Sequence, residues 1–441
     1  MVGDGAARVS SVCTDTRAFV PGALFVALRG ERFDAHEFVP GAQEAGAAAV
    51  LVEHWVDGMR GPALLVPDAR RALGELAAGW RRRFALPLIA VAGSNGKTTV
   101  KEMVASILAV QYGADARLAT TGNLNNDVGV PLTVFGLKAG HRAAVVEVGM
   151  NRPGEIAWLA RIAQPTVALV NNAQREHQEF MHSVEATARE NGAVFESLGP
   201  EGIAVFPGDD PHADIWRGLA GPRRRIEFGL GEGFEVRAPA DAVPASFEMQ
   251  VAGAGVSVQL AIDGSHNVRN ALAAAACAHA LGIAPDTIAE GLRRFRPVRG
   301  RLVRLQGATG ASVIDDTYNA NPDSVRAAID VLRGRPAPRV LVLGDMGEVG
   351  DHGPQFHREV GAYAAECGIG HLLATGPATL EAVAAFGPGG EHFADVDALA
   401  DRARGLAVPE ATVLVKGSRF MRMERVVAAL VRRPDGAGTN H

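Results

Sequence analysis

The chain has 441 residues, of which 47% are hydrophobic and 21% charged; this composition is typical of soluble globular proteins and excludes a disordered or fibrous chain. At about 150 residues per domain, its length predicts about three domains. Lysine and arginine together number 44 and aspartate and glutamate 49, so the formal net charge is −5, and the composition indicates no nucleic-acid or membrane partner.

The cysteines and the apolar runs bear on the cell compartment. Cys13, Cys277 and Cys367 form no Cys-x-x-Cys pair, which argues against a disulfide framework or a zinc site and favours a reducing environment. The first ten residues lack the basic and apolar stretches of a signal peptide. The longest apolar runs have about eight residues, too few to cross a bilayer. We therefore expect a cytoplasmic protein without a stable membrane anchor.

Residues 1–85 predict a small N-terminal α/β domain. Short strand-like runs at 22–28 and 47–52 alternate there with turn residues. The segment ends in a basic cluster at 81–83, which we interpret as a solvated helix end before a linker.

Residues 86–298 predict a central, mostly parallel α/β domain. A buried run at 87–92 leads into a glycine-rich turn and a helical pattern that begins at Thr98, and further strand-like runs follow at 143–148 and 166–170. Between 225 and 263 apolar residues alternate with polar ones, which predicts antiparallel hairpins added to this sheet.

Residues 299–441 predict a C-terminal Rossmann-like α/β domain. A proline and a glycine near residue 300 mark its start. Strand-like runs, each followed by a helical pattern, occur at 312–314, 340–343, 371–374 and 412–415. This alternation is typical of a doubly wound sheet. The predicted fold class is thus α/β with three domains, the central one carrying an antiparallel β insert.

The strongest local signal is the run AVAGSNGKTT at residues 90–99. A buried strand enters a glycine-rich turn, and the following helix presents the positive end of its dipole, so backbone N–H groups converge on phosphate oxygens. Lys97 is expected to neutralise the β- and γ-phosphates of ATP and Thr98 to bind Mg²⁺. The predicted phosphate-binding residues are Gly93, Ser94, Asn95, Gly96, Lys97, Thr98 and Thr99. By itself this loop does not separate a ligase from a kinase, a motor or a switch.

Several longer motifs accompany the phosphate loop. They are TDTR (14–17), PGALFVALRG (21–30), RFDAHEF (32–38), TGNLNNDVGVPLT (121–133), VVEVGMNRPGEI (145–156), GSHNVRNA (264–271), DDTYNANPDS (315–324), LGDMGEVG (343–350) and VKGSRFMRME (415–424). Together with GSNGKTT, and in this order along nearly the whole chain, they resemble the Mur ligases.

The resemblance implies a reaction and its substrates. The carboxylate of a UDP-N-acetylmuramoyl-tripeptide attacks ATP to give an acyl phosphate, and the amine of D-alanyl-D-alanine then displaces phosphate, in peptidoglycan precursor synthesis. ATP and Mg²⁺ are the implied cofactors, and a monomer is expected. The implied domain roles are binding of the UDP substrate by residues 1–85, binding of ATP by 86–298, and closure on ATP with binding of D-alanyl-D-alanine by 299–441.

The resemblance also assigns roles around ATP. The implied catalytic residues are Lys97, Glu147, His177 and Arg301, and the implied metal ligands are Thr98, Glu147 and His177. Asn270 would meet the adenine, Arg301 the γ-phosphate and Asp316 the ribose. From the residues alone, Glu147 suits either a Mg²⁺ ligand at the carboxyl end of a strand or a solvated strand end, and Asn270 also suits a capping residue. Lys416 remains open between a functional and a structural role.

The substrate contacts rest on the same resemblance. The implied set is Thr14, Asp15, Arg17, Phe33, Asp34 and His36 for the uridine end, Asn125 and Asn126 for the sugar or peptide, and Tyr318, Asn319 and Asn321 for D-alanyl-D-alanine. Read plainly, DTR is a turn and FDAHEF a helix start, and the asparagines of the 121–133 loop also suit turn chemistry.

One position departs from the family pattern. Mur ligases commonly carry a lysine, carbamylated by CO₂, that binds a second Mg²⁺, and Asn191 stands at this place. Misalignment does not explain the difference, since the four lysines of the chain are Lys97, Lys101, Lys138 and Lys416. We expect a nearby carboxylate, Glu190 first or Glu179 second, or bound water, to replace the carbamate.

Two other classes of function stay open on the sequence. A sister enzyme, either another Mur ligase or a folylpolyglutamate synthase, shares the GxxGKT chemistry, although the latter would not need the N-terminal uridine motifs. A P-loop ATPase switch, or an inactive homologue used for binding, belongs to a different class.

Overall fold

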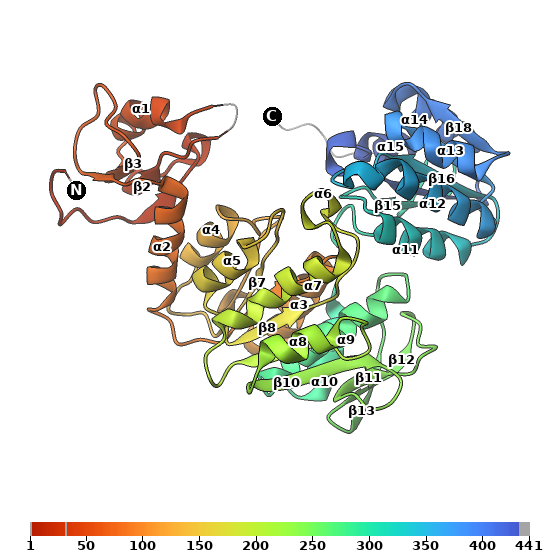
Figure 1. The fold of residues 1–441 in the computed structure, drawn as a ribbon, viewed down its shortest axis with the longest axis horizontal. Helices are drawn as coiled ribbons and strands as arrows, with labels where there is room; N and C mark the ends of the chain where they lie inside the picture. Colours follow the sequence, from red (N-terminus) through yellow and green to blue (C-terminus); the bar gives the residue numbers. More distant parts are fainter. Residues whose placement is uncertain (1, 31–32, 432–441) are drawn as a thin grey trace.

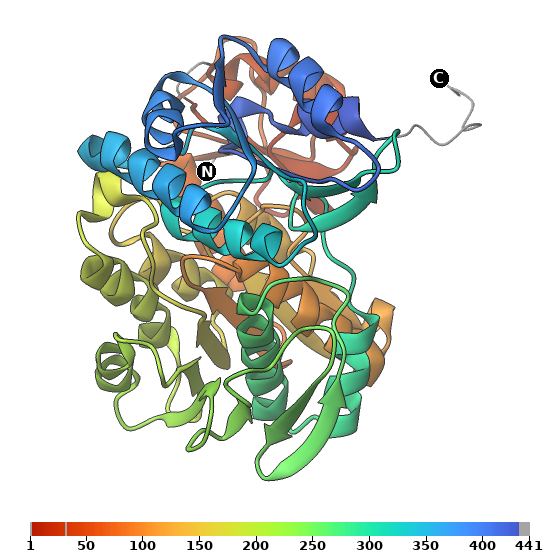
Figure 2. The ribbon, with the colours of Figure 1, turned by 90° about the vertical axis from the view of Figure 1, so that its right-hand side faces the viewer.

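A computed structural model describes residues 2–30 and 33–431, and within them the strands form three sheets (Figure 1). In Figures 1 and 2 the N-terminal part (red) and the C-terminal part (blue) both lie above the central part (yellow to green). The α/β fold class with three units is confirmed, while the boundaries at 85/86 and 298/299 remain predictions. None of the helices in this described part has the length and apolar character of a membrane span.

The N-terminal sheet has four parallel strands in the order β1-β2-β3-β4. Its elements are β1 (Ser11–Cys13), β2 (Ala23–Val26), α1 (Val39–Glu44), β3 (Ala49–Val52), β4 (Ala63–Leu65) and α2 (Ala69–Arg81). β2 and β3 are buried along their whole length, as expected for parallel strands covered on both faces. Asp68 caps α2 by accepting from the N–H of Arg71, and Ala69 and Leu73 at the start of that helix pack against β2 and β3.

The central sheet has nine strands in the order β13-β12-β11-β10-β9-β8-β5-β7-β6. The strands are β5 (Leu88–Ala92), β6 (Arg117–Ala119), β7 (Ala143–Glu147), β8 (Val167–Val170), β9 (Ile203–Pro207), β10 (Arg224–Leu230), β11 (Val236–Ala238), β12 (Phe247–Val251) and β13 (Ala254–Val258). The helices are α3 (Lys97–Tyr112), α4 (Gly129–Phe135), α5 (Glu155–Ala163), α6 (Gln178–Met181), α7 (Val184–Gly192), α8 (Ala213–Ala220), α9 (His266–Ala280) and α10 (Pro285–Arg294).

The predicted antiparallel insert is shorter than expected. β12 pairs antiparallel with both β11 and β13, but β10 pairs in parallel with β9 and with β11. The β9–β10 pair is parallel because α8 connects these two strands and returns the chain in the same direction, as in any βαβ unit. The prediction of hairpins from residue 225 onward is therefore wrong for β10.

The C-terminal sheet has six strands in the order β14-β15-β19-β16-β17-β18, all parallel except the β14–β15 pair. Its elements are β14 (Val303–Gln306), β15 (Ser312–Asp316), α11 (Pro322–Arg333), β16 (Arg339–Gly344), α12 (Gly353–Glu366), β17 (His371–Thr375), α13 (Leu380–Phe386), β18 (Gly390–Phe393), α14 (Val396–Leu406), β19 (Thr412–Lys416) and α15 (Glu424–Leu430). The four predicted strands are present. β14 and β18 were not predicted, because these edge strands are only partly buried and lack an apolar run.

The prediction that the basic cluster at 81–83 is a solvated helix end is wrong for Arg81. Its guanidinium is buried, with 5% of the residue exposed, and donates to the carbonyls of Phe84 (2.6 Å), Ala163 (3.0 Å), Leu86 (3.1 Å) and Gln164 (3.3 Å). Arg82 and Arg83, the other two arginines of the cluster, are exposed. Arg81 thus fastens the end of α2 to the end of α5 and to the linker.

We predict that Arg81→Met destabilises the protein, because it leaves buried carbonyl groups without donors. The expected cost is about 2 kcal/mol, or about 5 °C in the Tm of thermal unfolding followed by circular dichroism. The exposed neighbour gives a matched control, since Arg82→Met is expected to leave the Tm unchanged. Equal Tm values for the two variants would contradict this role of Arg81.

Candidate active site

The phosphate loop lies between β5 and α3, and its shape depends on two glycines. Gly93 and Gly96 have φ values of +128° and +82°, a region that favours glycine. A Cβ atom on Gly96 would lie 2.4 Å from Asn270 Oδ1 and 2.7 Å from Asn171 Nδ2. The backbone therefore approaches the asparagine side chains too closely for any other residue.

Lys97, the first residue of α3, folds back over this loop. Its ammonium group donates to the carbonyl oxygens of Gly93 (2.5 Å) and Ser94 (3.0 Å) and to Glu176 Oε1 (2.7 Å). The positive charge is thus held at the helix N-terminus, where an anion is favoured.

Glu147 ends β7 and is 2% exposed. Its Oε1 accepts hydrogen bonds from Asn125 Nδ2 (2.8 Å) and from the Thr98 hydroxyl (3.2 Å). Among the described residues, Oε2 of the same carboxylate has no hydrogen-bond partner. A buried carboxylate oxygen left free beside a hydroxyl is a donor set that suits a hard divalent cation such as Mg²⁺.

His177 stands between two carboxylates. Its Nε2 lies 3.4 Å from Glu176 Oε1, and its Nδ1 lies 2.8 Å from Glu348 Oε2. Burial alone would lower the pKa of His177, but the two carboxylates outweigh it and raise this pKa to about 9. Burial of Glu176 acts to raise its pKa, yet the charges of Lys97 and His177 prevail and lower it.

A chain of amide groups lies behind the loop, where the adenine is expected. Asn171 Nδ2 donates to the carbonyl of Asn95 (2.7 Å) and to Asn270 Oδ1 (2.9 Å), and Asn270 Nδ2 donates to Asn267 Oδ1 (2.8 Å). Asn270 is thus buried and bonded within the protein. These contacts fix its orientation beside the loop.

The C-terminal domain brings three charged residues to the loop. The Arg301 guanidinium lies 3.9 Å from the centre of the Tyr318 ring, and its Nη2 donates to the Thr98 hydroxyl (3.3 Å). Lys416 Nζ donates to Asp316 Oδ2 (2.6 Å) and to the carbonyl of Asn319 (2.9 Å). Lys416 is thus held in a buried ion pair and also borders both cavities described next.

Two cavities meet at the phosphate loop. One has a volume of about 290 Å³ and includes Asn270 and Asp316; the other has about 370 Å³ and includes Glu147 and His177. Both are bordered by Asn95, Gly96, Arg301, Ser324 and Lys416. Residues expected for the nucleoside and those expected for the chemistry therefore line adjoining spaces on the two sides of one loop.

The asparagines predicted to bind substrate also have partners in the protein. Asn126 Oδ1 accepts from the N–H of Gly129 (2.8 Å), the first residue of α4. Asn321 caps α11, and its Nδ2 donates to Asn95 Oδ1 (2.9 Å). All the predicted asparagines and Tyr318 border the 370 Å³ cavity, namely Asn125, Asn126, Asn319 and Asn321. Their contacts with substrate remain predictions.

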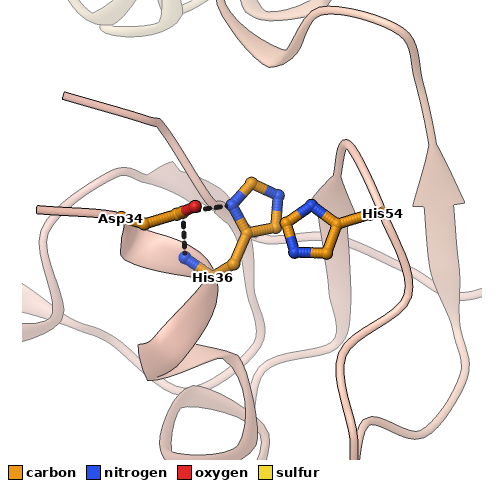
Figure 3. Close-up of side chains that lie close together, drawn as sticks. All are labelled: Asp34, His36 and His54. Carbon is orange, nitrogen blue, oxygen red and sulfur yellow. Dashed lines mark hydrogen bonds and ion pairs between the residues drawn. The ribbon is translucent and has the colours of Figure 1, made fainter.

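The N-terminal residues predicted for the uridine end form local contacts. Asp34 accepts from the N–H of His36 (3.0 Å), and its Oδ1 lies 2.5 Å from His36 Nδ1 (Figure 3). The His54 ring stacks on His36 with centroids 4.3 Å apart. His36 Nε2 accepts from the N–H of Glu53 (2.9 Å), so both ring nitrogens are engaged and this trio does not offer a metal site.

The other N-terminal residues are at the surface. Asp15 pairs with Arg17 at 2.7 Å, and this hydrogen-bonded contact lowers the pKa of Asp15 to about 2. Phe33 is 66% exposed. In the described part of the chain, none of the six residues predicted for the uridine end, Thr14 included, borders the two cavities at the phosphate loop.

Our expectation for the missing lysine is wrong in detail. Glu190 is occupied elsewhere, because its carboxylate accepts from the N–H groups of Gly154 (2.9 Å) and Ile156 (3.0 Å) at the start of α5. Glu179 is exposed and lies outside the described residues that border the cavity. The carboxylates beside His177 are instead Glu176 and Glu348. Glu176 is not among the predicted residues, although it directly precedes that histidine in the sequence.

Comparison with known proteins identifies the family. Residues 8–81, 91–278 and 300–419 match the families described as Mur ligase family, catalytic domain; Mur ligase middle domain; and Mur ligase, glutamate ligase domain. The UDP-N-acetylmuramoyl-tripeptide–D-alanyl-D-alanine ligase of Escherichia coli (strain K12) is 42% identical over 96% of this chain and 94% of its own length. The chain belongs to the Mur ligase family. A relative of the same name from Bacillus subtilis (strain 168) is 33% identical over 97% of this chain and 94% of its own length.

Solved structures agree with this assignment to the Mur ligases. MurF from Acinetobacter baumannii superposes with a TM-score of 0.89 at 36% identity, over 95% of this chain and 93% of that one. MurF ligase from Thermotoga maritima, in complex with ADP, has a TM-score of 0.84 at 26% identity, over 96% and 97%. Folylpolyglutamate synthase from Mycobacterium tuberculosis covers 83% of this chain at 18% identity, a likeness of fold alone.

We predict that Gly96→Ala weakens binding of ADP to this Mur ligase at least about tenfold, because the added Cβ pushes against hydrogen-bonded asparagines. Isothermal titration calorimetry measures the affinity. Gly113 gives a matched control, since it has a similar φ of +96° but, within the described residues, no neighbour inside 4 Å of its Cβ position. Equal loss of affinity in Gly113→Ala would show that backbone strain, not the contact with Asn270, is responsible.

Proposed function

We propose that this Mur ligase joins D-alanyl-D-alanine to a UDP-N-acetylmuramoyl-tripeptide at the expense of ATP. The observation that carries the proposal is the contact series from Arg301 through the Thr98 hydroxyl to Glu147, which joins both domains at the phosphate loop. The names of the relatives from Escherichia coli and Bacillus subtilis support these substrates. Action in the cytoplasm as a monomer is part of the proposal, and three free cysteines support a reducing compartment.

The reaction must bring two anions together. In its first step a carboxylate oxygen of the tripeptide bonds to the γ-phosphorus of ATP, the bond to the bridging oxygen breaks, and ADP leaves. In the second step the amine of D-alanyl-D-alanine bonds to the acyl carbon, phosphate leaves with the acyl oxygen, and the amine loses a proton. Positive charge around the γ-phosphate therefore supplies most of the catalysis.

In this proposal different residues at the loop bind the phosphates, the Mg²⁺ and the nucleoside. Lys97 and the N-terminus of α3 hold the β- and γ-phosphates, and Arg301 reaches the γ-phosphate from the C-terminal domain. Thr98 and Glu147 would hold Mg²⁺, which shields the charge of the phosphates when bound. Asn270 and Asp316 border the cavity proposed for the nucleoside.

Domain contacts exclude water from the acyl phosphate in this proposal. Asn321 of the C-terminal domain binds Asn95 of the loop. Arg175 of the central domain pairs with Asp323 at 2.7 Å and with Glu359 at 2.6 Å, both in the C-terminal domain. These contacts hold the domains together over the reacting groups, which protects a reactive intermediate from hydrolysis.

The proposed activity predicts that phosphate release from ATP requires both substrates together. A coupled phosphate assay compares four mixtures: ATP alone, ATP with tripeptide, ATP with D-alanyl-D-alanine, and all three. Only the complete mixture is expected to release phosphate continuously. Equal release with neither substrate would indicate an ATPase switch, and release with a single amino acid in place of the dipeptide would indicate another Mur ligase.

Glu147→Gln is predicted to lower kcat about 100-fold or more, because it removes the charge that holds the cation at the γ-phosphate. Thermal stability is expected to stay equal or to rise, since the substitution removes a buried charge with an unbonded oxygen. Phosphate release and the Tm are the two measurements, and the exposed Glu201→Gln is the control. A large fall in Tm would assign Glu147 a structural role instead.

A further inference from the structure

We propose that Glu176 is the anionic ligand of a second divalent-cation site beside the phosphate loop, where it does the work of the absent carbamylated lysine. His177 supplies the neighbouring ligand, and Glu348 of the C-terminal domain orients that histidine. The inference rests on the proposed function for the identity of the cation as Mg²⁺, but its geometry is independent of which amide the enzyme forms.

The first observation is that the Glu176 carboxylate is buried and has one oxygen without a hydrogen-bond partner among the described residues. The residue is 9% exposed and borders the 370 Å³ cavity together with Glu147. Its Oε1 binds Lys97, whereas its Oε2 has no hydrogen-bond partner in residues 2–30 and 33–431. Because a buried anionic oxygen without a partner is costly, this atom is suited to a cation.

The second observation is the spacing between Glu176 and His177. Adjacent ligands of an octahedral Mg²⁺ with bonds of about 2.1 Å lie about 3 Å apart. The Glu176 Oε1 and His177 Nε2 atoms are 3.4 Å apart. Because Oε1 already binds Lys97, the free Oε2 of the same carboxylate is the ligand atom, and a small adjustment of the two side chains lets it share one ion with Nε2. Glu147 borders the same cavity with its own free oxygen, which leaves room for two cation sites along the phosphates.

The third observation is the contact of Glu348 with the other nitrogen of the histidine. Glu348 Oε2 lies 2.8 Å from His177 Nδ1. This is a close ion-pair contact and not a hydrogen bond, since Nδ1 has no hydrogen-bond partner among the described residues; carboxylates occupy this position beside the outer nitrogen in histidine metal sites. Both residues have unusual backbone conformations, with φ of +48° for His177 and +59° for Glu348. Non-glycine residues adopt such angles only where the surrounding contacts hold them.

The fourth observation is that the lysine position is closed to a carbamate. Asn191 is 1% exposed, and its Oδ1 accepts from the N–H of Gly93 at 3.1 Å. This amide is neutral and is directed at the backbone of the loop. The negative charge that a carbamate would bring is instead present in Glu176, which needs no CO₂ to form.

The competing explanation is that Glu176 serves only as the counterion of Lys97. It accounts for the 2.7 Å contact but not for the free Oε2 or for the position of Glu348. The two explanations differ in what they predict for cation binding, because a counterion of Lys97 has no effect on the number of bound ions.

The deciding experiment counts bound Mn²⁺ by electron paramagnetic resonance in the full chain, with a non-hydrolysable ATP analogue. The wild type is expected to bind two Mn²⁺ ions, and Glu176→Gln to bind the second at least about tenfold more weakly with the first unchanged. Glu179→Gln, an exposed carboxylate three positions away, is the matched control and is expected to match the wild type. Two undiminished Mn²⁺ sites in Glu176→Gln would overturn the proposal.

Two further variants guard against a general effect on folding. Glu176→Asp keeps the charge and is expected to recover the second Mn²⁺ in part, whereas a failure equal to that of Glu176→Gln would contradict a ligand role. Glu348→Gln is expected to weaken the second site by about tenfold and to leave the first unchanged. Loss of both sites in Glu348→Gln would overturn its assignment to His177.

A carbamate has its own spectroscopic signature, which provides a separate test. The wild type incubated with ¹³C-bicarbonate is expected to show no protein carbamate resonance in its ¹³C spectrum, and removal of CO₂ is expected to leave Mn²⁺ binding unchanged. A carbamate resonance together with CO₂-dependent Mn²⁺ binding would overturn the proposal. A chain that binds two Mn²⁺ ions but does not use the tripeptide would contradict the proposed function and leave this inference standing.

Discussion

Two carboxylates, Glu147 and Glu176, are buried next to a loop built to receive polyphosphate, and the rest of the site is arranged to balance their charge. Each has one oxygen bonded to the loop or its lysine and one oxygen without a partner among the described residues. Burying such anions costs several kcal/mol unless cations accompany them. Under our proposal ATP adds more negative charge, which Lys97 and Arg301 alone do not balance, so divalent cations would be needed there.

Both the central and the C-terminal domain contribute charged groups to the site. The central domain supplies the loop and the buried acids, whereas Arg301 and Glu348 come from the C-terminal domain. Contacts of Asn321 with Asn95 and of Arg175 with Asp323 hold these groups in place. Under the proposed function, these contacts between the domains place the charges and keep water away from an intermediate that is sensitive to hydrolysis.

The sequence predicted those parts of the fold that depend on local patterns. Strands β5, β7, β8, β15 and β19 are buried along nearly their whole length, so they appear as apolar runs, and the glycine-rich turn after β5 marks the phosphate loop. Edge strands β14 and β18 lack such runs. The direction of β10 depends on a helix crossover rather than on the strand itself.

The site shows the same division between local and distant causes. The position of Glu147 follows from the strand that it ends, so its place at the loop could be expected. Arg81 has partners 82 and 83 positions away in addition to two nearby ones, and the partners of Glu190 lie 34 and 36 positions away. No local pattern predicts a distant backbone group as the partner of a charged side chain. The role of Asn191 also depends on a distant contact, with Gly93.

Glu176 lies between the phosphate-binding lysine and the histidine of the proposed second cation site. Its Oε1 holds Lys97 at 2.7 Å and also faces His177. When a cation shares this carboxylate under our proposal, the attraction between Glu176 and Lys97 weakens, because the same negative charge is then divided between two positive groups. Lys97 is thereby released toward the phosphates as the cation arrives. A carbamate borne at position 191 would carry its charge on α7, so the use of Glu176 makes the phosphate-binding lysine and the second cation dependent on one side chain.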